Sequence, residues 1–489
     1  MSYSEPGAAA VSESPPNYRA TTDPKLRLLI PMVIAVAFFM EQLDSTIITT
    51  SIPEMARSLD ENPLRLNLAI TSYLLSLAVF IPISGWIADR FGTRTMFCAA
   101  IGIFTVGSAL CGVATSLPML VATRVLQGFG GAMMTPVGRL ILFRSFPKEG
   151  LITAMTYMTI PALIGPTLGP VIGGLLTTYA SWRWIFYVNI PIGAIGMALA
   201  LRFIDQVREP SPSRFDFIGF GILGTGLALL QFAIESLVRP VGDTGAGAII
   251  GEGALFATAF AILLVYRWHA RRCLSPALDL SLFQIRSFRI GVGAGGVCRI
   301  GLNAVPFLLP LLFQLGFGLS PLRSGLLTFM MSVGALVMRT MASRLLRTFG
   351  FRRLLIGNAV IGALAIAGLA LVGADTPHWV VVIYVLVFGV IRSTQFIGIN
   401  ALSYAEIPAR RMSAATSLGG VAQQLSMGFG IAISAALLGM VTGPGGSVTL
   451  AGFDIVFVLV ALVTLASTTG FVRLGARDGA EVSGHGAGR

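Results

Sequence analysis

The feature that most constrains this chain is a succession of apolar runs, each about 20 residues long. A run of this length can cross a bilayer as an α-helix, which satisfies every backbone polar group within the segment. Charged residues make up only 11% of the 489 residues, against about 25% in typical proteins. The alternating segments of about 10 residues that form membrane barrels do not occur in the sequence. The sequence therefore predicts an all-α integral membrane protein.

The apolar runs predict fourteen membrane spans. They cover residues 28–51, 66–88, 95–114, 118–142, 151–175, 184–204, 216–236, 247–268, 289–314, 322–345, 353–373, 379–401, 413–441 and 453–473. Residues 1–26 are rich in Ser, Pro and Ala and contain no apolar core, which predicts a disordered cytoplasmic tail and no cleaved signal peptide.

The basic residues predict the orientation. With the N-terminus inside and the spans alternating, 25 of the 34 Lys and Arg lie on the cytoplasmic side, as the positive-inside rule requires. Both termini are then cytoplasmic, in the inner membrane. The basic residues of the short cytoplasmic loops thus explain the net charge of +12, and nucleic-acid binding is not needed to account for it. Five basic residues lie at the outer side, namely Arg57, Arg65, Arg183, Arg239 and Arg323. Four lie in the interior of spans, at least six residues from either end, namely Arg124, Arg299, Arg339 and Arg392.

Cysteine and histidine give no sign of a metal site or a disulfide framework. The four cysteines fall in spans or a cytoplasmic loop, and the three histidines are far apart along the chain. We expect no metal and no cofactor. A nucleophile-and-base arrangement and a nucleotide-binding P-loop are also missing from the sequence, which argues against an enzyme and against ATP as the energy source.

Two short stretches repeat in equivalent places of the span order. "SGWIADRFGTR" (84–94) aligns with "ASRLLRTFGFR" (342–352), and the pattern R-x-x-Q-x-x-G occurs at both Arg124 and Arg392. Spans 1–6 then correspond to spans 9–14, and spans 7 and 8 form an inserted pair. Two such halves around a midplane cavity are a common plan of secondary transporters. The predicted units are 1–26 (tail), 27–206 (first six-helix bundle), 207–288 (inserted pair and loop), 289–475 (second bundle) and 476–489 (cytoplasmic tail).

Several motifs resemble those of the major facilitator superfamily, in its 14-helix drug:proton antiporter branch (EmrB/QacA-like). The resemblance covers most of residues 28–475 and implies proton-coupled multidrug efflux on two pseudo-symmetric six-helix bundles with two extra central helices. It departs from the family pattern at Thr95, Thr156 and Arg347, where a basic residue, a Gly and an Asp are usual. The motifs are "LDSTIITTSIP" (43–53), "GWIADRFGTR" (85–94), "RVLQGFGGAMMTP" (124–136), "GPTLGPVIGG" (165–174) and "WRWIFYVNIPIG" (182–193).

Two of these motifs indicate moving parts. In the loop after the second span, Gly85 is expected to permit close helix contact and Gly92 a tight turn, and Asp89 to cap a helix or pair with Arg90 or Arg94. This loop is either an ordinary turn or a latch between the halves. In the fifth span, small residues and prolines predict a close helix crossing or a bend at the interface between the halves. These residues are Gly165, Gly169, Pro170, Gly173 and Gly174.

The first span carries two carboxylates, Glu41 and Asp44, on one helix face. A carboxylate in hydrocarbon is costly, so such residues usually face a cavity and act in transport. At about 1.5 Å per residue, both carboxylates lie at the depth of Arg124 in the fourth span. We interpret Glu41, Asp44 and Arg124 as a proton-coupling triad. The alternative is a structural ion pair.

The second half carries charge of the opposite sign in its spans. Arg299 and Arg392 fall near the midplane, and neither has a carboxylate within its own span. They either contact cargo or hydrogen-bond to backbone carbonyls and hold helices together. The candidate residues of a substrate cavity are Gln127, Arg299, Asn303, Arg392, Gln395 and Gln423.

The predicted function is proton-driven export of small amphipathic compounds across the inner membrane, with the bilayer, protons and a small molecule as partners. One alternative is a transporter of an organic anion or metabolite. A more remote one is a membrane sensor or structural protein on a transporter fold, although the sequence lacks a sizeable soluble output domain.

Overall fold

The computed structural model describes residues 24–146, 148–209, 214–238, 246–442, 448–475 and 478–483. These residues form helices, and none of them lies in a strand. Most of the predicted tails, residues 1–23 and 484–489, lie outside the described residues, but the first helix begins at Pro24, inside the predicted tail. In the first half the helices are α2 (Pro24–Ile47), α3 (Ile52–Ser58), α4 (Leu68–Phe91), α5 (Thr93–Gly112), α6 (Leu117–Ser145), α7 (Lys148–Tyr179), α8 (Trp184–Tyr187) and α9 (Asn189–Phe203).

The remaining helices continue the same pattern. The predicted inserted pair corresponds to α10 (Phe217–Glu235) and α11 (Ala246–Ala270). They are followed by α12 (Arg286–Leu311), α13 (Pro321–Gly368), α14 (His378–Tyr404), α15 (Met412–Met440), α16 (Leu450–Ala466), α17 (Thr468–Phe471) and α18 (Ala480–Ser483). Short 3-10 segments lie at Ile48–Thr50, Arg65–Asn67, Leu280–Gln284, Leu369–Leu371 and Ala409–Arg411, and a π-helical turn lies at Leu312–Gly316.

Within the described residues, eleven helical stretches are long and apolar enough to cross a membrane. The longest, Pro321–Leu371, contains two crossings, because the backbone turns at Gly350 inside α13. Helices α6 and α7 fall outside these eleven, but their 29 and 32 residues exceed the roughly 20 needed to span the hydrocarbon core. Counted in this way, the described chain makes the fourteen predicted crossings.

Several helices begin where the sequence provides a capping side chain. Ser116 precedes α6 and Ser320 precedes α13, and each accepts a hydrogen bond from a backbone N–H in the first turn. In both helices a proline follows the cap, where its missing N–H costs nothing. Asp216 caps α10 and Thr449 caps α16 in the same way.

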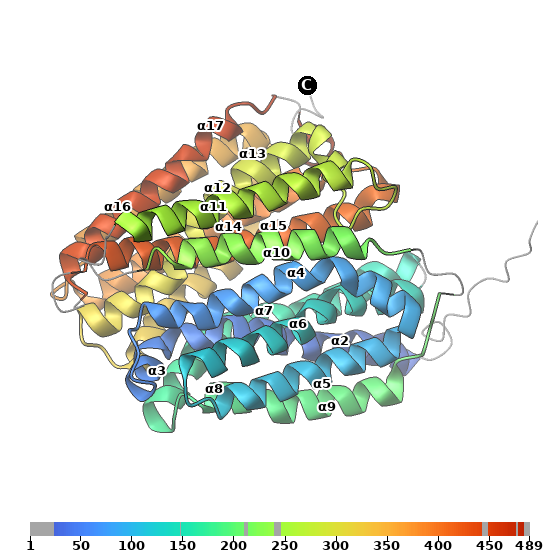
Figure 1. Ribbon diagram of the computed structural model, residues 1–489, viewed down its shortest axis with the longest axis horizontal. Coiled ribbons are helices and arrows are strands. Elements are labelled where there is room, and N and C mark those ends of the chain that lie inside the picture. Colours follow the sequence, from blue (N-terminus) through green and yellow to red (C-terminus); the bar gives the residue numbers. More distant parts are fainter. Residues whose placement is uncertain are drawn as a thin grey trace, which may run out of the picture.

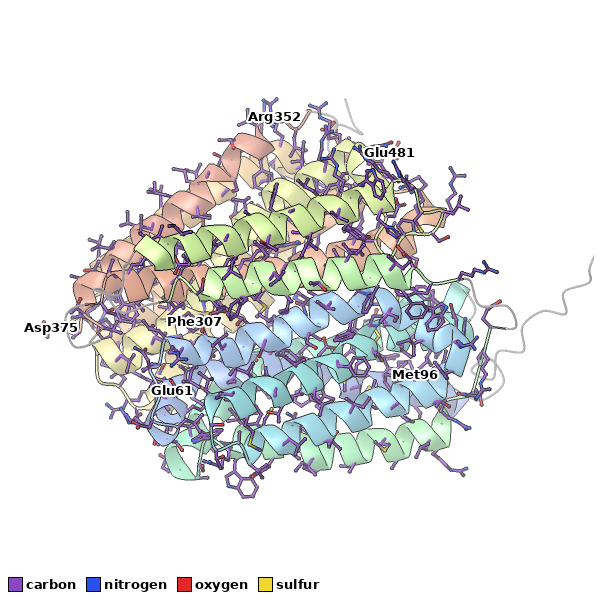
Figure 2. All side chains as sticks on the ribbon, viewed as in Figure 1. Glu61, Met96, Phe307, Arg352, Asp375 and Glu481 are labelled. Atoms are coloured by element: carbon purple, nitrogen blue, oxygen red, sulfur yellow. The ribbon has the colours of Figure 1, made fainter. Side chains whose placement is uncertain are left out.

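The helices gather into two groups that meet along a central seam (Figure 1). Helix α7 contacts α13 and α4 contacts α15 across this seam, while α10 packs on α4, α11 and α15. Figure 2 shows Glu61 and Asp375 toward one end of the molecule and Met96 and Glu481 toward the other. We refer to these as the Glu61 end and the Met96 end. The boundaries of the predicted units remain predictions.

Candidate functional site

A buried ion pair joins α2 to α6. Arg124 Nη1 donates to Asp44 Oδ2 over 2.6 Å, and both side chains are fully buried. Gln127 completes a closed group, since its Oε1 accepts from Arg124 Nη1 at 2.7 Å and its Nε2 donates to Asp44 Oδ1 at 2.8 Å. The structure thus brings together Asp44 and Arg124, which the sequence placed at one depth.

Three further groups that the sequence analysis missed complete this ion pair. Arg124 Nε donates to the carbonyl oxygen of Ala69 in α4 at 2.8 Å, and its guanidinium lies 4.2 Å from the centre of the Tyr73 ring. Asn189 Nδ2 donates to Asp44 Oδ1 at 3.2 Å. Asn189 lies in the motif "WRWIFYVNIPIG", where an amide inside an apolar span was the available signal. The pair therefore links α2, α4, α6 and α9.

The second carboxylate of the predicted triad has a different hydrogen-bond partner. Glu41 Oε2 accepts from Thr135 Oγ1 at 2.8 Å, and among the described residues no hydrogen bond joins Glu41 to Arg124. The predicted three-membered arrangement therefore needs correction. Asp44 and Glu41 lie three residues apart, but their partners lie at different levels of α6, so the two carboxylates are held separately.

A cavity of about 380 Å³ lies on the seam and is lined from both halves. Phe307, labelled in Figure 2, is one of its lining residues. The wall contributed by the first half includes Glu41, Gln42, Ser45, Thr46, Thr49, Tyr73, Leu74, Leu77, Pro166, Thr167 and Pro170. The wall contributed by the second half includes Asn303, Pro306, Phe307, Thr328, Met331, Ser332, Arg339, Arg392, Phe396, Asn400, Gln423, Gln424 and Met427.

The two midplane arginines of the second half bond to amide side chains. Arg392 Nη2 donates to Asn303 Oδ1 at 3.0 Å, and Arg299 Nη2 donates to Asn400 Oδ1 at 2.6 Å. The predicted alternative, in which both arginines hydrogen-bond to backbone carbonyls, is therefore wrong, because their acceptors are side-chain amides. Both guanidinium groups lie over the Phe396 ring, 4.8 Å (Arg392) and 5.4 Å (Arg299) from its centre.

Half of the predicted cavity residues line the cavity. Asn303, Arg392 and Gln423 do so. Gln127 is instead buried in the ion-pair group, and Arg299 lies behind Asn400. Gln395 Oε1 accepts a hydrogen bond from Asn358 Nδ2 at 2.8 Å, which joins α14 to α13. The three positions that the prediction assigned wrongly face neighbouring helices, because residues three or four apart share a helix face only approximately.

The loop between α4 and α5 is held by partners far along the chain. Asp89 Oδ1 accepts from Arg144 Nη2 at 2.8 Å at the end of α6, whereas in the described chain it forms no ion pair with Arg90 or Arg94. Gly92 has φ 93° and makes the predicted turn. No described atom lies within 4 Å of a Cβ placed on Gly85, so the close contact predicted there is wrong for this conformation.

The same loop also binds the segment after α9. The Glu209 N–H donates to the Asp89 carbonyl oxygen at 3.1 Å, and the Thr93 N–H donates to the Val207 carbonyl oxygen at 3.0 Å. Gln206 Nε2 donates to the Phe91 carbonyl oxygen at 2.9 Å. These contacts tie the loop to α6 and to residues 205–209, so a latch across the two halves remains a prediction.

The glycine motif of α7 makes close contacts on two sides. A Cβ on Gly165 would lie 2.9 Å from the Phe39 carbonyl oxygen, and one on Gly173 would lie 2.3 Å from that of Ile47, both at α2. On Gly169 it would meet the Thr46 side chain. On Gly174 it would lie 2.5 Å from the Pro321 carbonyl oxygen, at the start of α13. The motif thus makes the predicted close crossing within the first half and also contacts α13 across the seam, where Pro170 lines the cavity. The predicted bend at the interface stays a prediction.

A cluster that the sequence did not predict lies at the end of the inserted pair. Asp216, His269 and Cys273 each have a side-chain atom that could bind a metal ion, and these atoms lie within 4.8 Å of one another. His269 Nε2 lies 2.8 Å from Asp216 Oδ1. Burial raises the pKa of Asp216, but hydrogen bonds from the Gly219 N–H and from His269 outweigh it, and the pKa lies below its ordinary value. The carboxylate caps α10 and joins it to the end of α11.

Comparison with known proteins identifies relatives over most of the chain. A family model described as the Major Facilitator Superfamily matches residues 34–431. A putative multidrug resistance protein MdtD of Cronobacter sakazakii is 41% identical over 410 residues, which is 83% of this chain and 85% of that protein. A protein of the same description from Klebsiella pneumoniae is 39% identical over 411 residues, with the same coverage of 83% and 85%.

Solved structures with a similar fold are more distant in sequence. A variant of the nucleoside transporter NupG has a TM-score of 0.65 at 14% identity, covering 91% of this chain and 98% of that one. A D-xylose-proton symporter has a TM-score of 0.62 at 15% identity, covering 90% of this chain and 98% of that one. At this identity the likeness concerns the fold alone.

Proposed function

Since the chain belongs to the Major Facilitator Superfamily, we propose that it is a proton-coupled antiporter of the multidrug efflux type. It exports small amphipathic compounds across the inner membrane by alternating access, with the proton gradient as energy source and no bound cofactor. The descriptions of the MdtD relatives as putative multidrug resistance proteins support this cargo class.

The observation that carries the proposal is the fully buried Asp44–Arg124 pair beside the cavity. A buried carboxylate with a buried cation is poised between two states, because protonation leaves the cation without its partner and deprotonation restores the pair. The surrounding polar groups of Gln127 and Asn189 can serve the carboxylate in both states. Asp44 is therefore the proton site.

Helix α2 transmits the change to the cargo. It carries Asp44 toward α6, while Glu41, Gln42 and Ser45 of the same helix line the cavity. Tyr73 of α4 lies under the Arg124 guanidinium and also lines the cavity. Protonation of Asp44 loosens the attachment of α2 to Arg124, and the cavity wall formed by this helix shifts with it.

Alternating access requires the seam to open at one end at a time. At the Glu61 end the halves are in contact, since Gln314 Nε2 donates to the Thr50 carbonyl oxygen at 2.9 Å and the Leu322 N–H donates to Thr178 Oγ1 at 3.1 Å. The Gly174 contact with Pro321 lies at the same end. These contacts separate when cargo is released on that side, which the distribution of Lys and Arg assigns to the outside, with both termini cytoplasmic.

Transport into inside-out vesicles with an acidic interior tests the proposal. The panel should contain amphipathic compounds of positive, zero and negative charge that do not titrate in the pH range used, because a pH gradient alone cannot trap them. We expect gradient-driven uptake by the unchanged protein. In the Asp44→Asn protein it should fall to the level measured without a gradient, because the titrating group is lost with little change in volume.

Asp375→Asn is the matched control, since it makes the same chemical change on an exposed residue at the Glu61 end (Figure 2). This variant should transport normally. Undiminished gradient-driven uptake by folded Asp44→Asn protein would refute the coupling role.

A further inference from the structure

Each half of the molecule holds an arginine of its fourth helix against a residue of its first helix. In the first half Arg124 of α6 bonds to Asp44 of α2, and in the second half Arg392 of α14 bonds to Asn303 of α12. Residue 303 follows residue 44 by 259 positions, and residue 392 follows residue 124 by 268 positions, close to the offset of the repeated loops. Asn303 therefore occupies the place of Asp44 in the second copy.

This exchange leaves the second arginine without a counter-charge. Among the described residues neither Arg392 nor Arg299 forms an ion pair, and the Nε atom of each is buried with no hydrogen-bond partner. The amide oxygens of Asn303 and Asn400 each satisfy one donor of a guanidinium group, but they carry no charge. A buried cation is costly unless an anion accompanies it.

The wall of the cavity combines Arg392 with apolar side chains. Asn303, Arg392 and Asn400 line it together with Phe396, Met331 and Met427. Arg339 lies on the same wall, and Glu41 on the opposite wall is the only Asp or Glu among the lining residues that the structure describes. A planar guanidinium fork matches a carboxylate in two parallel hydrogen bonds, and aromatic and Met side chains accommodate apolar groups of varied shape.

We propose that Arg392, flanked by Asn303 and Asn400, binds the carboxylate of the cargo, so that this transporter takes amphipathic monocarboxylic acids as a substrate class. The inference deepens the proposed export function and rests on it. The cargo supplies at Arg392 the negative charge that Asp44 supplies at Arg124. Its apolar body packs on Phe396, Met331 and Met427.

Equilibrium binding to the full-length protein in lipid nanodiscs tests this with three probes of one apolar body: naphthalene-2-carboxylate, naphthalene-2-carboxamide and 2-naphthylmethylammonium. We expect the carboxylate to bind about tenfold more tightly than the carboxamide, as a charge-assisted hydrogen bond implies. Arg392→Gln should abolish this preference, so that carboxylate and carboxamide bind with similar affinity. Arg57→Gln, which removes the same charge from an exposed pair with Glu54, should keep the preference.

A second variant avoids removing the arginine. Asn303→Asp keeps the side-chain shape and gives Arg392 an internal partner, so the carboxylate preference should also disappear there. Equal binding of carboxylate and carboxamide by the unchanged protein would overturn the proposal, and so would a preference that survives in both folded variants. This outcome is separable from the outcome for export. If the carboxylate preference is absent while gradient-driven uptake of the cationic and neutral panel members is normal, carboxylate binding is refuted and proton coupling stands. If the Asp44→Asn protein transports normally, proton coupling is refuted and carboxylate binding stands.

Discussion

The Asp44–Arg124 pair of the first half and the Asn303–Arg392 contact of the second occupy equivalent helices, but their electrostatics differ. Arg124 has a carboxylate, an amide and a backbone carbonyl as acceptors and an aromatic ring beneath it. Among the described residues Arg392 has one amide oxygen as acceptor and lies over the Phe396 ring, and it lines the cavity. The two arginines thus differ by one carboxylate. Arg124 is neutralised by Asp44 inside the protein, whereas Arg392 has an amide partner and faces the cavity.

The backbone did not diverge in the same way. The loop after the second helix of each half turns at a glycine with positive φ, 93° at Gly92 and 68° at Gly350. The turn geometry is therefore retained in both copies, while Asp89 of the first loop is matched by Arg347 in the second. The two loops therefore share the glycine turn but carry opposite charges at this position.

The largest effect should come from removing Arg124, with removal of Arg392 as the comparison. Arg124→Gln leaves Asp44 buried without its cation, and we expect a loss of about 3–5 kcal/mol in the free energy of unfolding. Arg392→Gln leaves no carboxylate behind and removes a cation that has no counter-charge among the described residues, so it should cost less than about 1 kcal/mol. Denaturation of the purified proteins in one detergent measures both.

Adding Asp44→Asn to Arg124→Gln should recover most of the lost stability, because no unpaired charge then remains. Equal destabilisation by Arg124→Gln and Arg392→Gln would contradict the contrast between the two sites.

The second prediction concerns what the halves share. Gly92→Ala and Gly350→Ala should each cost about 1–3 kcal/mol in the free energy of unfolding, because both backbones lie in a region that only glycine adopts readily. Gly85→Ala is the control, since φ there is not positive and space is free around its Cβ position. Thermal unfolding of the three proteins gives the comparison. A neutral effect at Gly350 alone would mean that only the first loop depends on its turn.

The sequence could predict those features of the fold and of the site that a strong physical constraint determines. The spans were predictable, because lipid requires continuous helices of fixed minimum length. The meeting of Asp44 with Arg124 was predictable from depth along two helices. Depth does not give rotation or neighbours, so Asn189 was missed and Gln395 was assigned to the cavity although it faces α13.

Contacts between residues far apart along the chain could not be predicted for the same reason. The sequence offered Arg90 and Arg94 to Asp89 because they are close along the chain, whereas the structure gives it Arg144 from the end of α6. Asp216 and His269 meet only because α10 and α11 form an antiparallel pair whose ends coincide. Local spacing carries no information on such contacts.

The third prediction compares the two carboxylates of α2. Glu41 lines the cavity opposite Arg392 and is held by one hydrogen bond from Thr135, so Glu41→Gln should weaken uptake of cationic panel members about fivefold. Uptake of anionic members should be unchanged or improved. Asp44→Asn, by contrast, should stop gradient-driven uptake of every member. A Glu41→Gln protein that loses all cargoes equally would show that this carboxylate also couples protons.

The smallest effect should come from the loop charge that the second copy lacks. Asp89 and Arg144 are partly exposed, 33% and 21%, and lie 2.8 Å apart, so their pair should contribute no more than about 1 kcal/mol to stability. Asp89→Asn, Arg144→Gln and the double variant form a cycle in which each single change costs this amount and the second adds little. Salt should reduce the coupling, because exposed charges are screened. A zero coupling at low salt would mean that the hydrogen bonds from Glu209, Thr93 and Gln206 hold the loop without the ion pair.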